Sequence, residues 1–236
     1  MRFESVARTH VGCRRKINED ASLSLPEKGL WAVADGMGGH DCGEVASALV
    51  VQLLADSTTQ ESLARRVLAA EAAIRDANAR LLVMAGRDRR RTIGTTVVAV
   101  LSDGHRFACL WAGDSRAYCA RDGKLSQLSR DHSLVQELVD AGQLNAADAN
   151  NHPNANIITR AVGSEPRLEL DKIEGQIASG DVYLLASDGL TRLLSENEIL
   201  SGLKANDIAS QADKFIETCL ERGAPDNVTL VIVRVS

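Results

Sequence analysis

Four aspartates stand at the junction between an apolar segment and a turn, and no other part of the chain is as well suited to chemistry. Asp35, Asp114 and Asp188 follow apolar segments, whereas Asp226 precedes the last one. A buried strand that ends in Asp-Gly places the carboxylate at the rim of a sheet and lets the next carbonyl approach whatever the carboxylate binds. We therefore expect these acids to gather at strand ends, where they would form a site for hard cations.

Carboxylates gathered in this way need positive charge between them. Two of them a few ångströms apart repel by roughly 4 kcal/mol at an effective dielectric constant of about 20. All the candidate ligands are oxygen atoms, from the aspartates, from Glu19 and from the carbonyl group of Gly36. Oxygen ligands favour Mg²⁺ or Mn²⁺ over zinc or copper, and the sequence has no cluster of histidines and cysteines that would compete for the metal.

An arginine close to these acids indicates the substrate class. Two hard ions bridged by an aspartate can lower the pKa of a shared water and direct that water at a phosphorus atom in line with its leaving oxygen. A phosphate group then needs a forked donor, and Arg15 lies in the same N-terminal segment as Glu19 and Asp20. The residues alone therefore indicate hydrolysis of a phosphoester.

The composition is that of an ordinary globular protein. The chain has 236 residues, of which 44% are hydrophobic and 25% charged, and we expect one domain over residues 1–236. A formal net charge of −5 gives no reason to expect nucleic acid or an anionic membrane as a partner. Five cysteines without CxxC spacing favour reduced thiols over disulfides or a zinc site. Without a signal-like N-terminus or a long apolar run, we expect a cytoplasmic monomer that does not insert into membranes.

Short strand-like segments alternate with a few helical ones. Apolar patterns predict strands over 2–11, 21–25, 30–34, 95–101, 106–112, 115–120, 157–161, 168–173, 181–186 and 228–233. Helical spacing predicts helices over 43–55, 61–85, 131–141 and 206–220. We interpret 95–120 as an antiparallel meander and the polar run 143–156 as a mobile flap. This pattern is typical of an α+β domain with antiparallel sheets.

Seven short motifs occur in the order found in one enzyme family. They are Arg15-Lys16-Ile17-Asn18-Glu19-Asp20, Val33-Ala34-Asp35-Gly36-Met37-Gly38-Gly39, Gly94-Thr95-Thr96, Ala112-Gly113-Asp114-Ser115-Arg116, Thr159-Arg160-Ala161-Val162-Gly163, Ala186-Ser187-Asp188-Gly189 and Asp226-Asn227-Val228-Thr229. With these motifs the sequence resembles, over nearly its whole length, the metal-dependent PPM/PP2C serine/threonine phosphatases. It is most similar to a compact bacterial member of that family.

The resemblance implies an α-β-β-α sandwich, in which two antiparallel sheets are flanked by helix pairs and two Mn²⁺ or Mg²⁺ ions bind at one end. Asp35 resembles the ligand that bridges the ions, and the Gly36 carbonyl resembles a ligand of the second ion. Asp188 and Asp226 resemble ligands of the first ion.

The same resemblance assigns the other polar residues of the site. Asp20 resembles the acid that orients the attacking water, and Glu19 adds a contact to the second ion, directly or through water. Arg15 resembles the phosphate-binding arginine. Asp114 stands where bacterial relatives use an aspartate, together with that of Asp188, for a weaker third ion.

One position departs from the family pattern. Animal relatives carry a histidine after the Asp-Gly, where it is a candidate general acid, and this chain has Met37. Protonation of the leaving oxygen then falls to a water on the metal or to His40, for which we favour a packing role. We expect structural roles also for His132, for Arg116 in an internal salt bridge, and for Asn227 in a turn that positions Asp226.

The arginine-rich run at residues 87–91 has two interpretations. It is either a docking surface for acidic or phosphorylated partners or a solvated loop, and we favour the loop.

Competing functions are less consistent with the sequence. A cysteine phosphatase requires Cys-x₅-Arg and a P-loop enzyme requires GxxxxGK[ST], and neither motif is present. The segment from Gly36 to Asp41 lacks the third glycine of a dinucleotide fingerprint. A non-catalytic phosphoprotein-binding module on the same fold, and a partner-switching regulatory phosphatase, remain as alternatives. We favour a phosphatase whose partners are phosphorylated proteins and a cognate Ser/Thr kinase.

Overall fold

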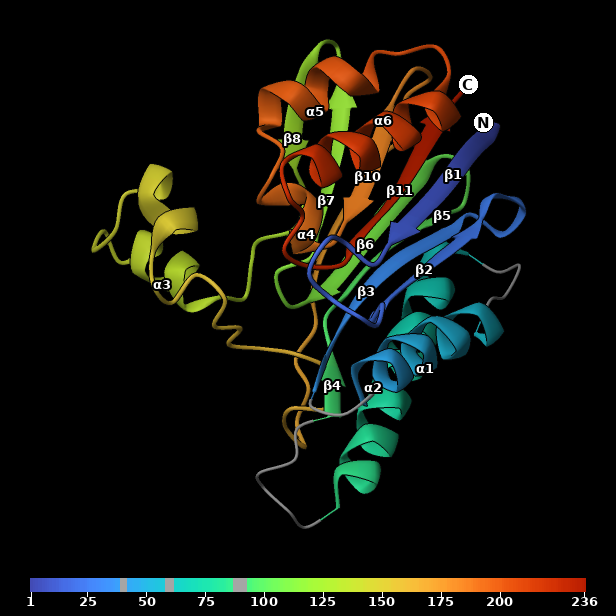
Figure 1. Cartoon of the computed structure of the whole chain (residues 1–236). Coiled ribbons are helices and arrows are strands. Elements are labelled where there is room, and N and C mark those ends of the chain that lie inside the picture. Colours follow the sequence, from blue (N-terminus) through green and yellow to red (C-terminus); the bar gives the residue numbers. More distant parts are fainter. Residues whose placement is uncertain (39–41, 58–61, 87–92) are drawn as a thin grey trace.

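The computed structural model describes residues 1–38, 42–57, 62–86 and 93–236. Two of the residue groups singled out above, His40 and the arginine-rich run 87–91, lie outside these ranges. Figure 1 shows two sheets packed face to face with helices on the outer sides. The two ends of the chain lie side by side, where Arg2 and Ser236 exchange backbone hydrogen bonds of 2.8 and 3.0 Å.

Both sheets are antiparallel throughout. Sheet A has the order β1-β11-β10-β7-β8, built from β1 (Phe3–His10), β11 (Val228–Val235), β10 (Val182–Ala186), β7 (Arg116–Arg121) and β8 (Lys124–Gln127). Sheet B has the order β2-β3-β5-β6-β9, built from β2 (Asp20–Leu25), β3 (Leu30–Gly38), β5 (Val97–Ser102), β6 (Arg106–Ala112) and β9 (Asp171–Gln176). A short strand, β4 (Ile93–Thr95), pairs with the end of β3, and a 3₁₀ turn, η1 (Pro26–Lys28), joins β2 to β3.

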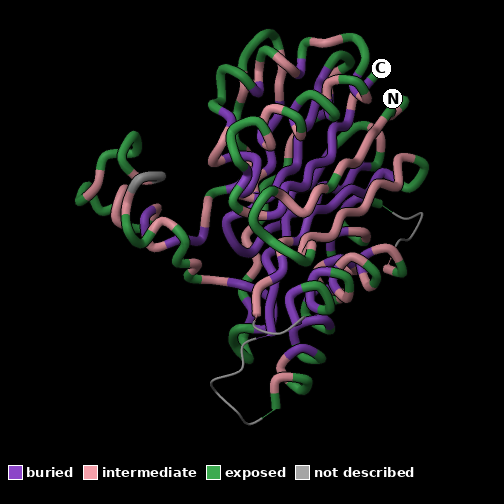
Figure 2. Tube along the Cα trace, viewed as in Figure 1, coloured by how far each residue is buried: buried purple, intermediate pink, exposed green. Residues whose placement is uncertain are grey.

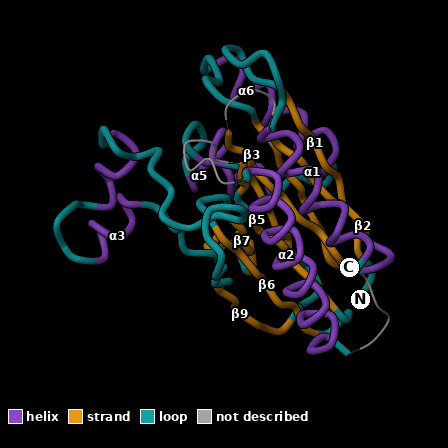
Figure 3. Tube along the Cα trace, turned by 90° about the horizontal axis from the view of Figure 1, so that it is seen from below, coloured by secondary structure: helices purple, strands orange, loops and turns teal. Residues whose placement is uncertain are grey.

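Helices cover the outer face of each sheet. On sheet B lie α1 (Cys42–Asp56) and α2 (Leu63–Ala85), which pack side by side (Figure 3). On sheet A lie the short α4 (Asp188–Thr191), α5 (Glu196–Leu203) and α6 (Ile208–Glu221). Among the helices in the described ranges, none combines the length and the apolar composition that crossing a membrane requires.

Burial explains why these segments form these layers. The buried positions of α2 step by three or four residues, so that one side of the helix faces sheet B. The central strands are buried on both faces, which gives them continuous rather than alternating apolar sequences. Trp31, Val98 and Leu185 belong to the core between the sheets, seen as the purple centre of Figure 2. The α-β-β-α layering confirms the predicted fold class.

A small lobe projects from the sandwich. It contains α3 (Leu134–Asp140) and the 3₁₀ helix η2 (Ala146–Asn151), coloured yellow in Figure 1. The predicted flap, residues 143–156, lies in this lobe. At the base of the lobe, Ser133 and Ile158 form an isolated antiparallel bridge.

The structure corrects two predictions about strand connections. Residues 115–120 were expected as the third strand of a meander, but β7 lies in sheet A whereas β5 and β6 lie in sheet B. The turn at Gly113, where φ is +116°, carries the chain from one sheet to the other. The strand ending at Ala34 was expected to give way to a glycine turn, but β3 continues to Gly38 and pairs with β4.

Further differences concern short or shifted elements. Residues 157–161 form no strand of their own, and the strand predicted over 168–173 begins at Asp171. The elements β8, α4 and α5 were not predicted. These segments are too short for a periodic pattern, and their positions depend on partners far away in the sequence.

The layering gives a direct test in α2. Ile74 is 0% exposed and faces sheet B, whereas Leu68 on the same helix is 60% exposed. We expect Ile74→Ala to lower the free energy of unfolding by about 2–5 kcal/mol because it leaves a cavity. Leu68→Ala should change it by less than about 0.5 kcal/mol. Urea unfolding measures both, and equal effects would mean that α2 does not bury this face.

Candidate active site

The fold brings five of the predicted acids to one end of the sandwich. Asp20 and Asp35 lie directly opposite each other in the register of β2 and β3. Asp114 lies in the turn after β6, Asp188 begins α4, and Asp226 immediately precedes Asn227 and β11. Burial, and then the charges of the other four carboxylates, raise the pKa of Asp35 well above its usual range. The site therefore combines side chains from both sheets.

Two of these acids have oxygen atoms without a partner. Burial raises the pKa of Asp20 to about 7, although Ser187 Oγ donates a hydrogen bond of 2.8 Å to its Oδ2. Burial, followed by the charge of Asp188, raises the pKa of Asp114 to about 7. Among the described residues, Oδ1 of Asp20 and Oδ1 of Asp114 are buried without a hydrogen-bond partner. An unpaired buried acceptor costs about 1–3 kcal/mol, and a hard cation is the partner that would remove this cost.

Arginines supply the positive charge in this conformation. Arg15 Nη2 lies 2.7 Å from Asp226 Oδ2, and Arg192 Nη2 lies 2.9 Å from Asp188 Oδ2 and 3.5 Å from Asp114 Oδ2. Across the ranges that the structure describes, no three His, Cys, Asp or Glu side chains are arranged as a ready metal-ligand group. The acids converge and are all oxygen donors, so they fit Mn²⁺ or Mg²⁺ once the arginines move aside.

Glu19 and Gly36 meet at the start of α1. Gly36 N donates to Glu19 O at 3.1 Å, and a Cβ at Gly36 would lie 2.2 Å from Gly43 O. A Cβ at Gly43 would lie 2.4 Å from Glu19 Oε1. The two glycines therefore let β3, α1 and the Glu19 carboxylate approach closely beside Asp35.

Hydroxyl groups hold two of the acids in place, and we had assigned these residues no role. Thr96 Oγ1 accepts a hydrogen bond of 3.0 Å from Asp35 N and shares one of 2.7 Å with Ser115 Oγ. Ser187 Oγ, which donates to Asp20, accepts from Thr229 N at 3.0 Å. All four residues lie within the motifs quoted above, but the motifs do not show which side chain contacts which.

Asn227 organises the loop that carries Arg15. Its Nδ2 donates to Val11 O at 2.9 Å and to Ile17 O at 3.0 Å, and its Oδ1 accepts from Glu19 N at 2.8 Å. Asn227 N also donates to Asp226 Oδ1 at 2.9 Å. Asn227 therefore does more than form the predicted turn before β11, because it also holds the backbone of the loop that carries Arg15.

Two other predictions of structural roles agree with the contacts. Arg116 forms an internal salt bridge of 2.7 Å with Asp131. His132 Nδ1 accepts a hydrogen bond of 3.1 Å from Gly113 N, and its Nε2 lies 3.2 Å from Asp171 Oδ2. Both side chains therefore help to hold the turn at Gly113 and the start of the lobe.

Comparison with known proteins places this site in a family. The family model for protein phosphatase 2C matches residues 13–229. The serine/threonine protein phosphatase PstP of Mycobacterium tuberculosis is 39% identical over 231 residues, which cover 97% of this chain and 44% of PstP. The chain thus spans less than half the length of that relative.

Solved structures agree with the sequence comparison. PppA, described as a key regulatory component of T6SS in Pseudomonas aeruginosa, has a TM-score of 0.92 and 42% identity, covering 100% of this chain and 99% of PppA. The catalytic domain of PstP, solved in complex with two manganese ions, has a TM-score of 0.88 and 36% identity, covering 99% of this chain and 98% of that domain. The fold is therefore that of serine/threonine phosphatases. The chain belongs to the protein phosphatase 2C family.

The raised pKa values predict how the metal-free protein responds to pH. Asp20 and Asp114 hold their protons up to about pH 7 when folded but release them near pH 3.8 when unfolded. The folded state therefore binds more protons in this window, so its stability falls as the pH rises. We expect the melting temperature in EDTA to fall by about 10–20 °C between pH 5 and pH 8, because these two groups together lower the free energy of unfolding by roughly 5 kcal/mol over that range.

Two comparisons check this prediction. Asp114→Asn removes one of the carboxyl groups whose pKa is raised, so the fall should be smaller in that variant. Addition of Mn²⁺ at pH 8 should raise the melting temperature of the wild type. A wild-type protein that is as stable at pH 8 as at pH 5 in EDTA would contradict the raised pKa values.

Proposed function

We propose that this chain is a metal-dependent phosphatase that hydrolyses phosphoserine and phosphothreonine in proteins. The convergence of Asp20, Asp35, Asp114, Asp188 and Asp226 around buried, unpartnered carboxylate oxygens carries the proposal. Membership of the protein phosphatase 2C family supports it, as does the relative solved with two manganese ions. A non-catalytic binding module would not need to bear the electrostatic cost of these acids.

Each residue has a proposed role toward two Mn²⁺ or Mg²⁺ ions. Asp35, central among the acids, would be shared by both ions. Asp188 and Asp226 would hold the first ion, and the Gly36 carbonyl and Glu19 would hold the second. Asp114, with Asp188, would provide a weaker third position. When bound, the ions would offset the carboxylate charge and make a water nucleophilic at neutral pH.

Asp20 is the proposed base toward that water. Ser187 fixes one of its oxygens, so the unpartnered Oδ1 is the oxygen that can accept a hydrogen bond from the water. Through that bond Asp20 would orient the water, and its Oδ1 would accept the proton that the water loses.

Arg15 is the proposed phosphate-binding group. Its side chain is 50% exposed at the edge of the site, and its partner Asp226 is one of the proposed ligands. A cation on Asp226 would compete with Arg15 for that carboxylate, and Arg15 would then have both terminal nitrogens available for a phosphate group.

The biological setting is a proposal as well. We propose that the phosphatase works in the cytoplasm as a monomer of one domain and that its flap lies beside the site. We also propose that it opposes a Ser/Thr kinase. Similarity to PppA, a component of T6SS regulation, makes secretion-system phosphoproteins the first substrates to test.

Metal dependence is the primary test. Phosphate release from a phosphothreonine peptide should require Mn²⁺, stop with EDTA and resume when Mn²⁺ is restored. Asp35→Asn should lower kcat/KM at least about 100-fold, more than the loss of a group that only supports a ligand. Asp122→Asn, the same change in the exposed β7–β8 turn, is the matched control and should leave activity unchanged. Activity that persists in EDTA would contradict the two-metal proposal.

Binding and chemistry can be separated at two positions. Arg15→Ala should raise KM by about tenfold with little change in kcat, because it removes a phosphate contact. Arg15→Lys keeps the charge but loses the fork, so it should recover only part of the affinity. Arg14→Ala, at the exposed neighbouring position, is the control. Asp188→Ala should mainly lower kcat, and the reverse pattern for Arg15 and Asp188 would contradict these roles.

A further inference from the structure

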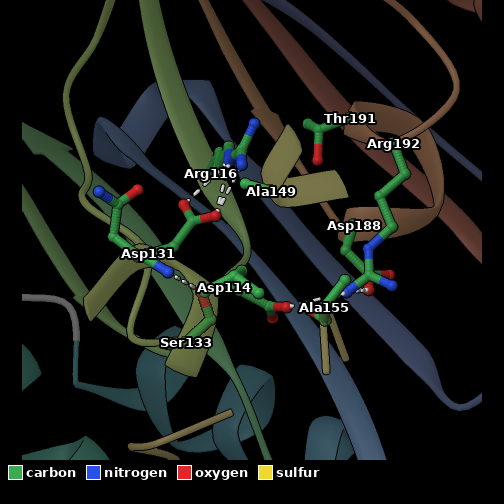
Figure 4. A pocket seen from close by; sticks show the side chains of 11 residues that line it. Asp114, Arg116, Asp131, Ser133, Ala149, Ala155, Asp188, Thr191 and Arg192 are labelled. Carbon is green, nitrogen blue, oxygen red and sulfur yellow. Dashed lines mark hydrogen bonds and ion pairs between the residues drawn. The ribbon is translucent and has the colours of Figure 1, made fainter. Parts of the chain in front are cut away.

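The proposed metal ligands are held in two different ways. Asp114 and Asp188 are carboxylates that an arginine side chain reaches directly, as Figure 4 shows for Arg192. The carbonyl group of Gly36 belongs to the backbone, so its position depends on the strands that pair around it. Gly36 lies opposite Thr95 in the register of β3 and β4. The placement of β4 therefore helps to fix the position of this carbonyl.

Strand β4 needs support from outside its own pairing with β3, because it has only three residues. Its other side meets a single residue, since Thr95 and Val162 exchange backbone hydrogen bonds of 2.9 Å in each direction. Thr95 Oγ1 also donates to Asp35 O at 2.9 Å, and Thr96 N donates to the same oxygen at 2.8 Å. Val162 thus supports the segment that contacts Asp35 and Gly36.

Val162 belongs to the motif Thr159–Gly163, to which the proposed reaction gives no role. The motif ends in a glycine that packs against β4. Gly163 has a φ of +89°, and a Cβ there would lie 2.3 Å from Ile93 O. A larger residue would force the motif away from β4, so this position requires glycine.

A buried asparagine of α2 holds the same segment from its other side. Asn78 is 3% exposed, and its neighbours on the buried side of the helix, Ile74 and Leu81, are apolar. Its Oδ1 accepts a hydrogen bond of 2.7 Å from Gly163 N, and its Nδ2 donates one of 2.9 Å to Glu165 O. Burying an amide among apolar groups is unfavourable unless its hydrogen bonds are satisfied. Both bonds go to one segment, which explains why this helix position is polar.

We propose that Asn78 is a positioning residue for the second metal ion. Through Gly163 and Val162 it holds β4 against the end of β3, and it thereby sets the position of the Gly36 carbonyl next to Asp35. The inference rests on the proposed function, in which that carbonyl is a ligand of the second ion. Residues that support a ligand without touching the metal typically change metal affinity or activity 10- to 100-fold.

The first test measures metal binding. Asn78→Leu has a similar shape and removes both hydrogen bonds, so calorimetric titration with Mn²⁺ should show the second ion bound at least about tenfold more weakly. The loss at the first ion should be smaller. The matched control is Ile74→Ala, one turn earlier in α2 and equally buried. It lowers stability without touching the motif, so at a temperature well below its melting point it should bind both ions as the wild type does.

The second test follows the backbone by hydrogen exchange in the metal-free protein. The amides of Thr95, Val162 and Gly163 are compared with those of β5, which report on the stability of sheet B as a whole. In Asn78→Leu the three amides should exchange at least about tenfold faster relative to β5, because local opening becomes easier. In Ile74→Ala all these amides lose protection together, so the ratio should stay at its wild-type value.

Two further variants assign the effect to the bond with Gly163. Asn78→Asp keeps the oxygen that accepts from Gly163 N and loses the donor to Glu165 O, so it should lie between the wild type and Asn78→Leu in both tests. Gly163→Ala leaves Asn78 intact but places a Cβ against Ile93 O, so it should reproduce the pattern of Asn78→Leu. It also decides the question if Asn78→Leu does not fold. Unchanged binding of the second ion, or unchanged relative exchange, would overturn the proposal.

These outcomes separate the positioning role from the proposed function. If Mn²⁺ binding and exchange behave as described but no phosphopeptide is hydrolysed, the phosphatase function fails and the role of Asn78 stands. If the wild type hydrolyses the peptide with Mn²⁺ and Asn78→Leu does so at the same Mn²⁺ concentrations, the role of Asn78 alone fails. A wild type that binds no Mn²⁺ would overturn both.

Discussion

Mutual repulsion among buried carboxylates is the constraint on which this structure depends. Five acids from two sheets lie close enough for their charges to raise the pKa of Asp35, and two of them have oxygens without a partner. An arrangement of this kind lowers stability and persists only when the rest of the fold is strong enough to hold it. The hydrophobic cores on both sides of each sheet provide that stability. The electrostatic cost is confined to the acidic end of the sandwich, where we propose that cations bind.

The scaffold fixes Asp20 and Asp35 by backbone and hydroxyl contacts rather than by salt bridges. Strand register sets Asp20 against Asp35, and Thr96 and Ser187 hold the two residues through their hydroxyl groups. Thr96 holds the backbone of Asp35 and Ser187 holds the carboxylate of Asp20, and neither neutral hydroxyl offsets the charge of the acid, so the site keeps its attraction for cations. Arginines are used only where they can move, as Arg15 and Arg192 can at the exposed edge.

The sequence was informative wherever the signal is local. An apolar segment ending in aspartate is visible in a single stretch, so the acids, the long α2 and the general layering could be predicted. The pairing of residues 36–38 with β4 could not be predicted, because β4 lies far from these residues in the sequence. The passage of the chain between sheets at Gly113 was missed for the same reason, since turn residues do not show which sheet follows. The contact of Arg192 with Asn156 could not be predicted either, because four-residue spacing indicates only the pairing of Arg192 with Asp188.

The pairing of the first strand with the last has a consequence for how the protein is made. β11 lies between β1 and β10, and Asp226 and Asn227 precede it directly. Until β11 has emerged from the ribosome, β1 therefore lacks its partner strand. The loop that carries Arg15 also lacks its hydrogen bonds to Asn227. Contacts between such distant segments close a long loop and form slowly. The acidic site would thus be complete only after the last strand of the domain has been made.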